Sequence, residues 1–216
     1  NNKAMKAFGA ELVVFGADFD EAREEVYRIA EAEGLFIVPP FHKELVRGVA
    51  TYAYELLCAQ PQIDTLYVPI GCGSGICGCI AARDALGLDT KIVGVVSEHA
   101  QTAKLSAESG SLIETNAAQT FADGMAVRVP VQEALDIYGP GAERIVTVSE
   151  EAIAKAIRVY YRDINNLAEG AGAAPLAALM QERDQMSGKE AAVILCGGNI
   201  DTDWFVSVMQ GGIPKV

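Results

Sequence analysis

The stretch that most constrains the fold is residues 65–81, where an apolar segment leads through a glycine-rich turn into a run of small residues. The residues that precede the glycine turn predict a short strand rich in β-branched side chains. Gly71, Gly73 and Gly75 alternate, so the turn can be sharp and can direct successive backbone N–H groups to one point. The small residues that follow predict a helix, whose N-terminus adds unpaired N–H groups and the positive end of its dipole. These features favour a bound phosphate group, and a tight turn without a ligand is the alternative.

Two familiar phosphate-binding motifs have glycine-rich turns of this kind. No Gly-Lys-Ser/Thr follows the turn, which excludes the P-loop of nucleotide triphosphatases. Gly73, Gly75 and Gly78 meet the G-x-G-x-x-G spacing of a dinucleotide-binding loop, and Glu98 stands at a suitable distance for its ribose-binding acid. Spacing alone therefore leaves a dinucleotide site open, and it is the C-terminal part of the chain that disfavours it.

Apolar segments and amphipathic segments alternate along the chain. Strands are predicted at residues 12–15, 35–38, 91–97, 144–148 and 191–195, and between residue 65 and the glycine turn. Helices are predicted between most of them, whereas residues 111–123 are polar without a clear period and are interpreted mainly as loop. This alternation predicts an α/β protein with a parallel twisted sheet covered by helices on both faces. Ligands of such sheets bind at the carboxyl ends of strands, where the 71–75 turn and Cys196 both fall.

Several residues mark expected helix ends. Asp18 and Glu21 form a pattern like a capping box, and Gly34 is a typical helix stop. Ser149 is expected to cap the helix that follows the 144–148 strand. His42 precedes another predicted helix and is interpreted as a loop or capping residue.

Length and composition exclude several classes of function. A chain of 216 residues suits one large domain, or one domain plus a further piece. The net charge of −12 makes nucleic acid and anionic membranes poor partners. No apolar run approaches the ~20 residues of a membrane span, and no signal peptide is recognisable. We therefore expect a cytoplasmic protein without a membrane segment.

The five cysteines are Cys58, Cys72, Cys77, Cys79 and Cys196. Three of them crowd the glycine turn, which suits a reducing compartment better than a disulfide framework. Zinc binding by Cys72, Cys77 and Cys79 is an alternative, but their spacing lacks a C-x-x-C pair. We therefore expect no metal at these thiols.

Four segments of the chain resemble a known family. They are Lys-Ala-Met-Lys-Ala-Phe-Gly-Ala-Glu at 3–11, Val-Pro-Ile-Gly-Cys-Gly-Ser-Gly at 68–75, Thr-Phe-Ala-Asp-Gly-Met-Ala-Val at 120–127, and Ile-Leu-Cys-Gly-Gly-Asn at 194–199. With them the chain resembles the pyridoxal-phosphate-dependent serine/threonine dehydratases, a fold type II family that includes serine racemase. The resemblance implies a tryptophan synthase β-like fold. It also implies that residues 1–38 end the small domain and that residues 39–216 form the large domain, which binds pyridoxal phosphate.

The resemblance implies a set of residues that bind pyridoxal 5′-phosphate. These are Gly71, Cys72, Gly73, Ser74, Gly75, Glu169 and Cys196. The turn departs from the family's run of glycines at Cys72 and Ser74, which binding through backbone N–H groups tolerates. Cys196 matches the residue that faces the pyridine nitrogen, where the family has Ser or Cys. Glu169 matches a turn near the cofactor, and an acid that opens a helix is an equally good interpretation of it.

Some members of this family bind a divalent cation beside the active site. Glu98 matches the first carboxylate of that site, but Lys104 stands where the second is expected. An ammonium group repels a cation, so we expect no metal.

The resemblance implies a lyase that converts L-threonine or L-serine to a 2-oxo acid and ammonia, acting as a homodimer on a small amino acid. Serine racemase and a hydroxyaspartate-type dehydratase are close alternatives. None of the lysines has the family's Ser-x-Lys-x-Arg context, so Lys104, Lys189 and Lys215 are interpreted as solvated surface residues. We therefore expect no catalytic residue in this chain: it matches the C-terminal two-thirds of the family, and the Schiff-base lysine belongs to an N-terminal segment upstream. A phosphate-ligand-binding domain that lacks this lysine is the non-enzymatic alternative.

Overall fold

The computed structural model describes residues 2–216, with side chains described from residue 5 onward. The chain divides into two compact units, Asn1–Pro39 and Pro40–Val216. Among the described residues, no helix is both long enough and apolar enough to cross a membrane.

The first unit contains the helices α1 (Asn2–Ala7) and α2 (Phe19–Glu33). The predicted cap of α2 is confirmed, because the Asp18 side chain accepts a hydrogen bond from the Glu21 N–H at 3.0 Å. The Glu21 carboxylate in turn accepts one from the Ala17 N–H at 2.8 Å. Gly34 ends the helix with a φ of 68°, which suits a residue without a Cβ.

The two strands predicted in the first unit, at residues 12–15 and 35–38, are wrong. Both segments are irregular, and most of their apolar side chains are exposed, with Val14 at 75% and Phe36 at 92%. A strand forms only when its N–H and C=O groups pair with a neighbouring strand. Among the described residues neither segment has such a neighbour, so apolar character alone was a misleading signal there.

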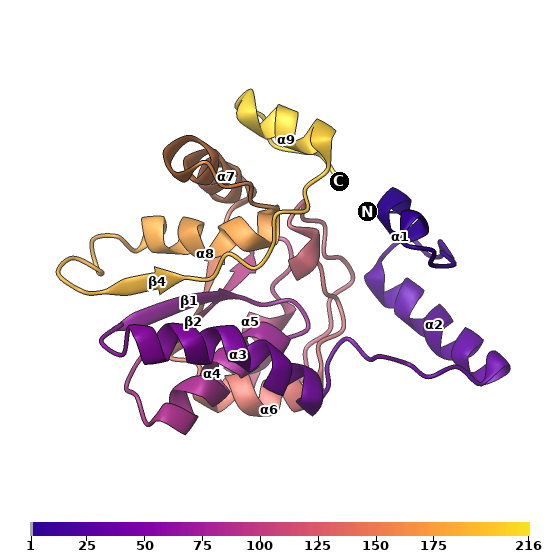
Figure 1. Ribbon diagram of the computed structural model, residues 1–216, viewed down its shortest axis with the longest axis horizontal. Coiled ribbons are helices and arrows are strands. Elements are labelled where there is room, and N and C mark those ends of the chain that lie inside the picture. Colours follow the sequence, from indigo (N-terminus) through magenta and orange to yellow (C-terminus); the bar gives the residue numbers. More distant parts are fainter. Residues whose placement is uncertain (1) are drawn as a thin grey trace. The chain divides into compact units, whose positions relative to one another are not determined.

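The second unit is built on a sheet of four parallel strands in the order β3-β2-β1-β4 (Figure 1). The strands are β1 (Thr65–Pro69), β2 (Lys91–Ser97), β3 (Arg144–Val148) and β4 (Ala191–Val193). In register, Thr65 of β1 lies beside Lys91 of β2 on one side and Ala191 of β4 on the other. The strands predicted at these four places are confirmed, although β4 ends two residues before the predicted limit of 195.

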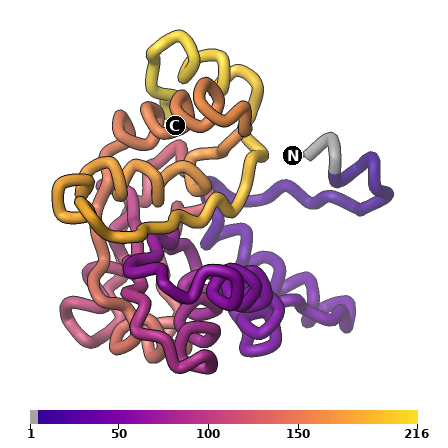
Figure 2. The backbone as a smooth tube through the Cα atoms, turned by 60° about the vertical axis from the view of Figure 1, so that its left-hand side comes forward, coloured from indigo at the N-terminus to yellow at the C-terminus, as the bar shows by residue number. Residues whose placement is uncertain are grey.

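Helices cover both faces of the sheet. One face carries α3 (Lys43–Ala59), α4 (Ser74–Leu86), α5 (Thr102–Ser109) and α6 (Gln132–Gly141); the other carries α7 (Glu150–Ile164), α8 (Gly170–Gln181) and α9 (Thr202–Met209). Figures 1 and 2 both show α9 beside α7, where the Arg158 guanidinium donates to the Val208 carbonyl at 3.1 Å. The predicted fold class, a parallel α/β sheet covered on both faces, is confirmed.

The sheet separates two hydrophobic cores. Along β1, Leu66 and Val68 pack with α3 and α4, whereas Tyr67 packs with α7 and α8. This alternation follows from the two-residue period of a strand. Because both faces are buried, the strand reads in the sequence as a continuous apolar run.

Two predicted helix caps are confirmed in this unit. The His42 side chain precedes α3 and accepts a hydrogen bond from the Glu44 N–H at 3.2 Å. The Ser149 hydroxyl precedes α7 and accepts one from the Ala152 N–H at 3.2 Å. The helices α5, α6 and α9 were not predicted from the sequence.

Candidate functional site

The order of the strands places a reversal of direction beside β1. The chain passes from β1 to β2 to β3 on one side, and then returns to add β4 on the opposite side of β1. In open parallel sheets, the crevice beyond the carboxyl ends of the strands at such a reversal is the usual ligand site. Here β1 leads into the glycine turn and β4 leads into Cys196, so both predicted regions meet at this crevice.

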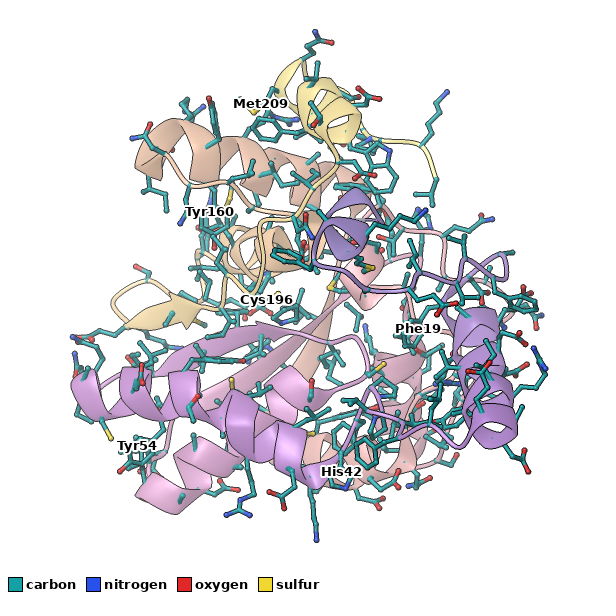
Figure 3. The ribbon with its side chains drawn as sticks, turned by 45° about the vertical axis from the view of Figure 1, so that its right-hand side comes forward. Phe19, His42, Tyr54, Tyr160, Cys196 and Met209 are labelled. Atoms are coloured by element: carbon teal, nitrogen blue, oxygen red, sulfur yellow. The ribbon has the colours of Figure 1, made fainter. Side chains whose placement is uncertain are left out.

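A cavity of about 330 Å³ lies at this place. Its walls come from α3, the glycine turn, the 3-10 turn Asp123–Met125, the start of α8 and the segment that follows β4. The residues that line it are Val49, Tyr52, Val68, Pro69, Gly71, Cys72, Gly73, Ser74, Gly75, Gly124, Glu169, Ala171, Ile194 and Cys196. All seven residues predicted from the sequence are among them. Figure 3 shows the position of Cys196 in the segment after β4.

The glycine turn depends on the absence of side chains at two positions. Gly73 has a φ of 98°, a conformation that other residues rarely adopt. A Cβ there would come within 2.7 Å of the Ala134 Cβ, and a Cβ on Gly71 would collide with the Gly124 carbonyl oxygen. The fold itself therefore requires these two glycines, whatever binds in the cavity.

Gly75 differs from the other two glycines. A Cβ at this position would meet no protein atom closer than the Tyr52 hydroxyl oxygen, at 3.7 Å. Gly75 lines the cavity. The absence of a side chain here is therefore not required by the packing of the protein, and it leaves space open in the cavity.

The N-terminus of α4 faces the turn without a side-chain cap. The Cys77 N–H donates to the Gly73 carbonyl at 3.1 Å, which is the first bond of the helix. Helix geometry leaves the N–H groups of Ser74, Gly75 and Ile76 without a partner inside the helix, and the N-cap Gly73 offers no side chain to accept from them. Unpaired donors and the positive end of the helix dipole favour an anion.

Glu169 ties the start of α8 to the segment that follows β4. Its backbone N–H donates to the Gly197 carbonyl at 3.1 Å, and its carboxylate accepts from the Asn199 N–H at 3.0 Å. A Cβ on Gly197 would overlap this carboxylate, so a larger residue there would force the Glu169 side chain to move. Glu169 occupies the N-cap position of α8, but its side chain makes no cap hydrogen bond, so its role is to join two walls of the cavity.

The Cys196 thiol opens into the cavity. Partial desolvation by the surrounding protein, and then the negative charge of Glu169, raise the pKa of Cys196 above its ordinary value. The thiol therefore keeps its proton at neutral pH, and it can act as a neutral hydrogen-bonding group but not as an acid.

The other seven lining residues were not named as site residues from the sequence, and Tyr52 and Gly124 are the two that matter most for the site. Tyr52 of α3 lines the cavity, and its hydroxyl lies 3.6 Å from the Cys79 sulfur. Burial, and then the nearby Cys79, raise the pKa of Tyr52 well above its usual value, so the phenol is neutral. Gly124 belongs to the segment 120–127, which carried the family resemblance. The resemblance pointed to this segment but gave no role to Gly124 itself.

Glu98 and Lys104 lie outside the cavity. One Glu98 oxygen accepts from the Glu150 N–H at 3.2 Å and lies 3.7 Å from the His99 ring nitrogen. The expectation that Lys104 is a solvated surface residue is wrong, because its side chain is only 28% exposed and its ammonium contacts the Thr147 hydroxyl at 3.3 Å. In the part of the chain that the structure describes, no three His, Cys, Asp or Glu side chains are grouped as metal ligands.

The parallel sheet, the strand reversal and the glycine turn at the head of a helix define an open α/β protein with a ligand cavity at its switch point. Within this class the family follows from sequence comparison. The chain belongs to the pyridoxal-phosphate dependent enzyme family, whose model matches residues 1–197. The family resemblance seen in the four sequence segments is thereby confirmed.

Known proteins similar to the chain carry lyase names. It is 36% identical to the L-threonine ammonia-lyase of Geobacter sulfurreducens over 97% of this chain and 52% of that protein. It is 29% identical to the L-threo-3-hydroxyaspartate ammonia-lyase of Saccharomyces cerevisiae over 96% of this chain and 64% of that protein. The processed threonine deaminase isoform 2 of Solanum lycopersicum has the same fold, with a TM-score of 0.90 and 27% identity over 97% of this chain and 59% of that one. The chain spans about half the length of the first of these relatives.

Proposed function

We propose that the cavity at the switch point binds pyridoxal 5′-phosphate. The residues fit this group, because the glycine turn offers backbone donors without side chains and the volume of about 330 Å³ leaves room for a ring beside a phosphate. The proposed binding residues are Gly71, Cys72, Gly73, Ser74, Gly75, Glu169 and Cys196. The phosphate lies at the turn and the N-terminus of α4, and the ring lies toward Cys196.

In this proposal each residue has a limited task. The turn binds the phosphate through N–H groups, with the Ser74 hydroxyl as a further donor. Cys196 keeps its proton on sulfur and offers the ring nitrogen a hydrogen bond without protonating it. When bound, pyridoxal phosphate supplies an electron sink for negative charge at the substrate α-carbon. The protein supplies binding and orientation.

The proposed activity is that of an ammonia-lyase, which converts L-threonine or L-serine to a 2-oxo acid and ammonia. The observation that carries it is that the chain aligns over 97% of its length with an L-threonine ammonia-lyase while its seven predicted residues line one cavity. No described lysine lines this cavity, so we assign no catalytic residue in these 216 residues. A lysine in a part of the relatives that this chain does not match is proposed to hold the cofactor covalently.

A second candidate substrate is 3-hydroxyaspartate, supported by the similarity to the yeast ammonia-lyase. Two further candidates for the function are serine racemase activity and a non-enzymatic domain that binds a phosphate ligand.

We also propose a homodimer in the cytoplasm. All five cysteines are free, which supports a reducing compartment. The first unit is proposed as the end of a small domain and the second, from residue 39 or 40, as the large cofactor-binding domain.

The test is a titration of the purified natural protein with pyridoxal phosphate, followed by assays with L-threonine, L-serine and L-threo-3-hydroxyaspartate. We expect saturable binding and release of ammonia together with a 2-oxo acid. The outcome that would contradict the proposal is an absence of saturable binding. Binding with formation of the D-amino acid, but without ammonia, would favour the racemase.

A further inference from the structure

We infer that Glu150 is a positioning residue for the phosphate-binding turn, although it does not line the cavity. Its carboxylate fixes the segment 120–124, and the end of that segment, Gly124, packs against Gly71. This inference rests on the proposed binding of a phosphate at the turn.

The Glu150 carboxylate receives three hydrogen bonds from two separate parts of the chain. Oε1 accepts from the Ser97 hydroxyl at 2.6 Å and from the Thr120 hydroxyl at 2.7 Å. Oε2 accepts from the Phe121 N–H at 3.0 Å. Hydrogen bonds to a charged acceptor are short and strong, so this one side chain joins the end of β2 to the irregular segment that precedes Gly124.

The Glu150 carboxylate is itself held by its position at the N-terminus of α7. Glu150 is the first residue of α7, where the positive end of the helix dipole favours a negative side chain. Its backbone N–H donates to the Glu98 carboxylate at 3.2 Å, and Ser149 caps the same helix. The anchor therefore depends on the terminus of a helix and the end of a strand.

The anchored segment leads directly into the cavity wall. The Thr120 hydroxyl also accepts from the Ala122 N–H at 3.0 Å, and the Ala122 carbonyl accepts from the Met125 N–H at 2.8 Å. These bonds place Gly124 where a Cβ on Gly71 would collide with its carbonyl oxygen.

On its other side the same segment packs against α8. A Cβ on Gly124 would lie 3.0 Å from the Ala171 Cβ, and a Cβ on Gly170 would lie 2.6 Å from the Ala122 Cα. Residues 122–124 thus form a wedge between the glycine turn and α8. The preceding stretch, residues 111–122, has no helix or strand that would hold it in place, so its position depends on side-chain contacts such as those of Glu150.

The test uses Glu150→Gln, which keeps the size of the side chain. An amide has a single acceptor oxygen, so at least one of the three hydrogen bonds is lost. Glu151→Gln is the matched control, because Glu151 is the next residue of α7, is exposed and carries the same charge. Thr120→Val removes one partner of the carboxylate and serves as a second variant.

Two measurements are made on each variant. One is the dissociation constant for pyridoxal phosphate compared with that for pyridoxal, which lacks the phosphate. The other is hydrogen exchange of the peptides that cover residues 70–77 and 120–127 in the protein without ligand. We expect Glu150→Gln and Thr120→Val to weaken pyridoxal phosphate binding about tenfold, with little effect on pyridoxal, since one hydrogen bond to a charged group is at stake. Exchange at both peptides should accelerate, and Glu151→Gln should match the wild type.

The inference is overturned if Glu150→Gln binds pyridoxal phosphate as Glu151→Gln does, or if exchange accelerates uniformly across the second unit. Failure of the wild type to bind would instead overturn the proposed function. The exchange of residues 70–77 in the ligand-free protein would then still decide the role of Glu150.

Discussion

At the scale of single residues, the cavity combines neutral polar groups with backbone donors. Among the described residues, no Lys or Arg lines it, and the one charged lining side chain, Glu169, is negative. A phosphate dianion placed there depends on N–H groups of the turn and on the dipole of α4. The affinity for a phosphate at this site therefore depends on the backbone conformation of the glycine turn.

Gly75→Ala should separate cofactor binding from folding. Gly75 is helical and an added Cβ meets no protein atom within 3.7 Å, so the substitution should stabilise the fold by about 0.5–1 kcal/mol. Because Gly75 lines the cavity beside the proposed phosphate site, the added methyl group is expected to take up room that the ligand needs, so affinity for pyridoxal phosphate should fall at least about tenfold, a loss of about 1.4 kcal/mol. Thermal unfolding and cofactor titration measure the two effects.

Gly48→Ala is the control for this substitution. Gly48 is also helical, an added Cβ there meets no atom within 4 Å, and the residue does not line the cavity. Gly48→Ala should stabilise the fold to a similar degree and leave affinity unchanged. Equal affinities for both variants would refute the phosphate position.

Cys196→Ser and Cys196→Asp should differ in their effect on the bound cofactor. Serine keeps a neutral hydrogen-bonding group, so absorbance and affinity should change little. Aspartate places an acid beside Glu169 at the proposed ring nitrogen, so the visible absorbance band should shift and its pH dependence should change. Cys58→Ser, at an exposed thiol outside the cavity, is the control. Identical spectra for serine and aspartate at position 196 would show that this residue does not face the ring.

At the scale of elements, helices and strands were predicted correctly from the sequence where the local pattern agrees with the tertiary context. The unit of β1, glycine turn and α4 was predicted because apolar strand residues, punctuating glycines and helix formers follow in order. The segments 12–15 and 35–38 had the apolar signal but, in the part of the chain that the structure describes, no strand to pair with. The helix α6 was missed because Gly139 and Pro140 in its last turn resemble a loop, and α5 because its eight residues have only a weak apolar face.

A partly buried ion pair joins three elements on the α8 side of the sheet. Glu182, at the end of α8, accepts from the Tyr67 hydroxyl of β1 at 2.6 Å and pairs with Arg144 at the start of β3. Burial alone would raise the pKa of Glu182, but hydrogen bonds from Arg144 and Tyr67 outweigh it and lower the pKa. The carboxylate is therefore more acidic in the folded chain than in the unfolded chain.

Glu182→Gln should destabilise the fold in a manner that depends on pH. At pH 7 we expect a loss of about 2 kcal/mol, because Arg144 loses its charged partner. A group with a depressed folded pKa stabilises fully above its unfolded pKa, about 4.5, and this stabilisation is lost as pH falls through the folded pKa. The gap between wild type and variant in urea midpoints should therefore be constant at neutral pH and should narrow below about pH 4.5.

Asp184→Asn controls for the loss of a charge near the end of α8, because the Asp184 side chain is 95% exposed. It should change stability by less than about 0.5 kcal/mol. A gap between wild type and Glu182→Gln that stays the same from pH 7 to pH 3 would show that the ion pair does not govern acid stability.

At the scale of the whole chain, several residues that line the cavity could be predicted from the sequence, but the packing of the elements that form its walls could not. The turn at 71–75, Glu169 and Cys196 could be named because motifs carried them. Tyr52 and Gly124 could not, because their place at the cavity follows from the packing of α3 and of the 120–124 segment. The strand order β3-β2-β1-β4, which creates the crevice, is a tertiary property that local periodicity does not contain.

The last prediction concerns lysine chemistry in these 216 residues. A stable covalent link to the cofactor aldehyde needs an amino group within bonding reach, and it is favoured when that amine has a lowered pKa. No described lysine lines the cavity, and the Lys104 ammonium is engaged by Thr147 and Glu108. Incubation of the chain with pyridoxal phosphate, reduction with borohydride and peptide mass mapping should give only scattered, substoichiometric adducts. Lys104→Arg, which keeps the charge without a reactive amine, should give the same pattern. A single stoichiometric adduct on Lys104, Lys189 or Lys215, accompanied by turnover of L-threonine, would falsify this prediction, because it would require a catalytic lysine that none of the described cavity walls provides.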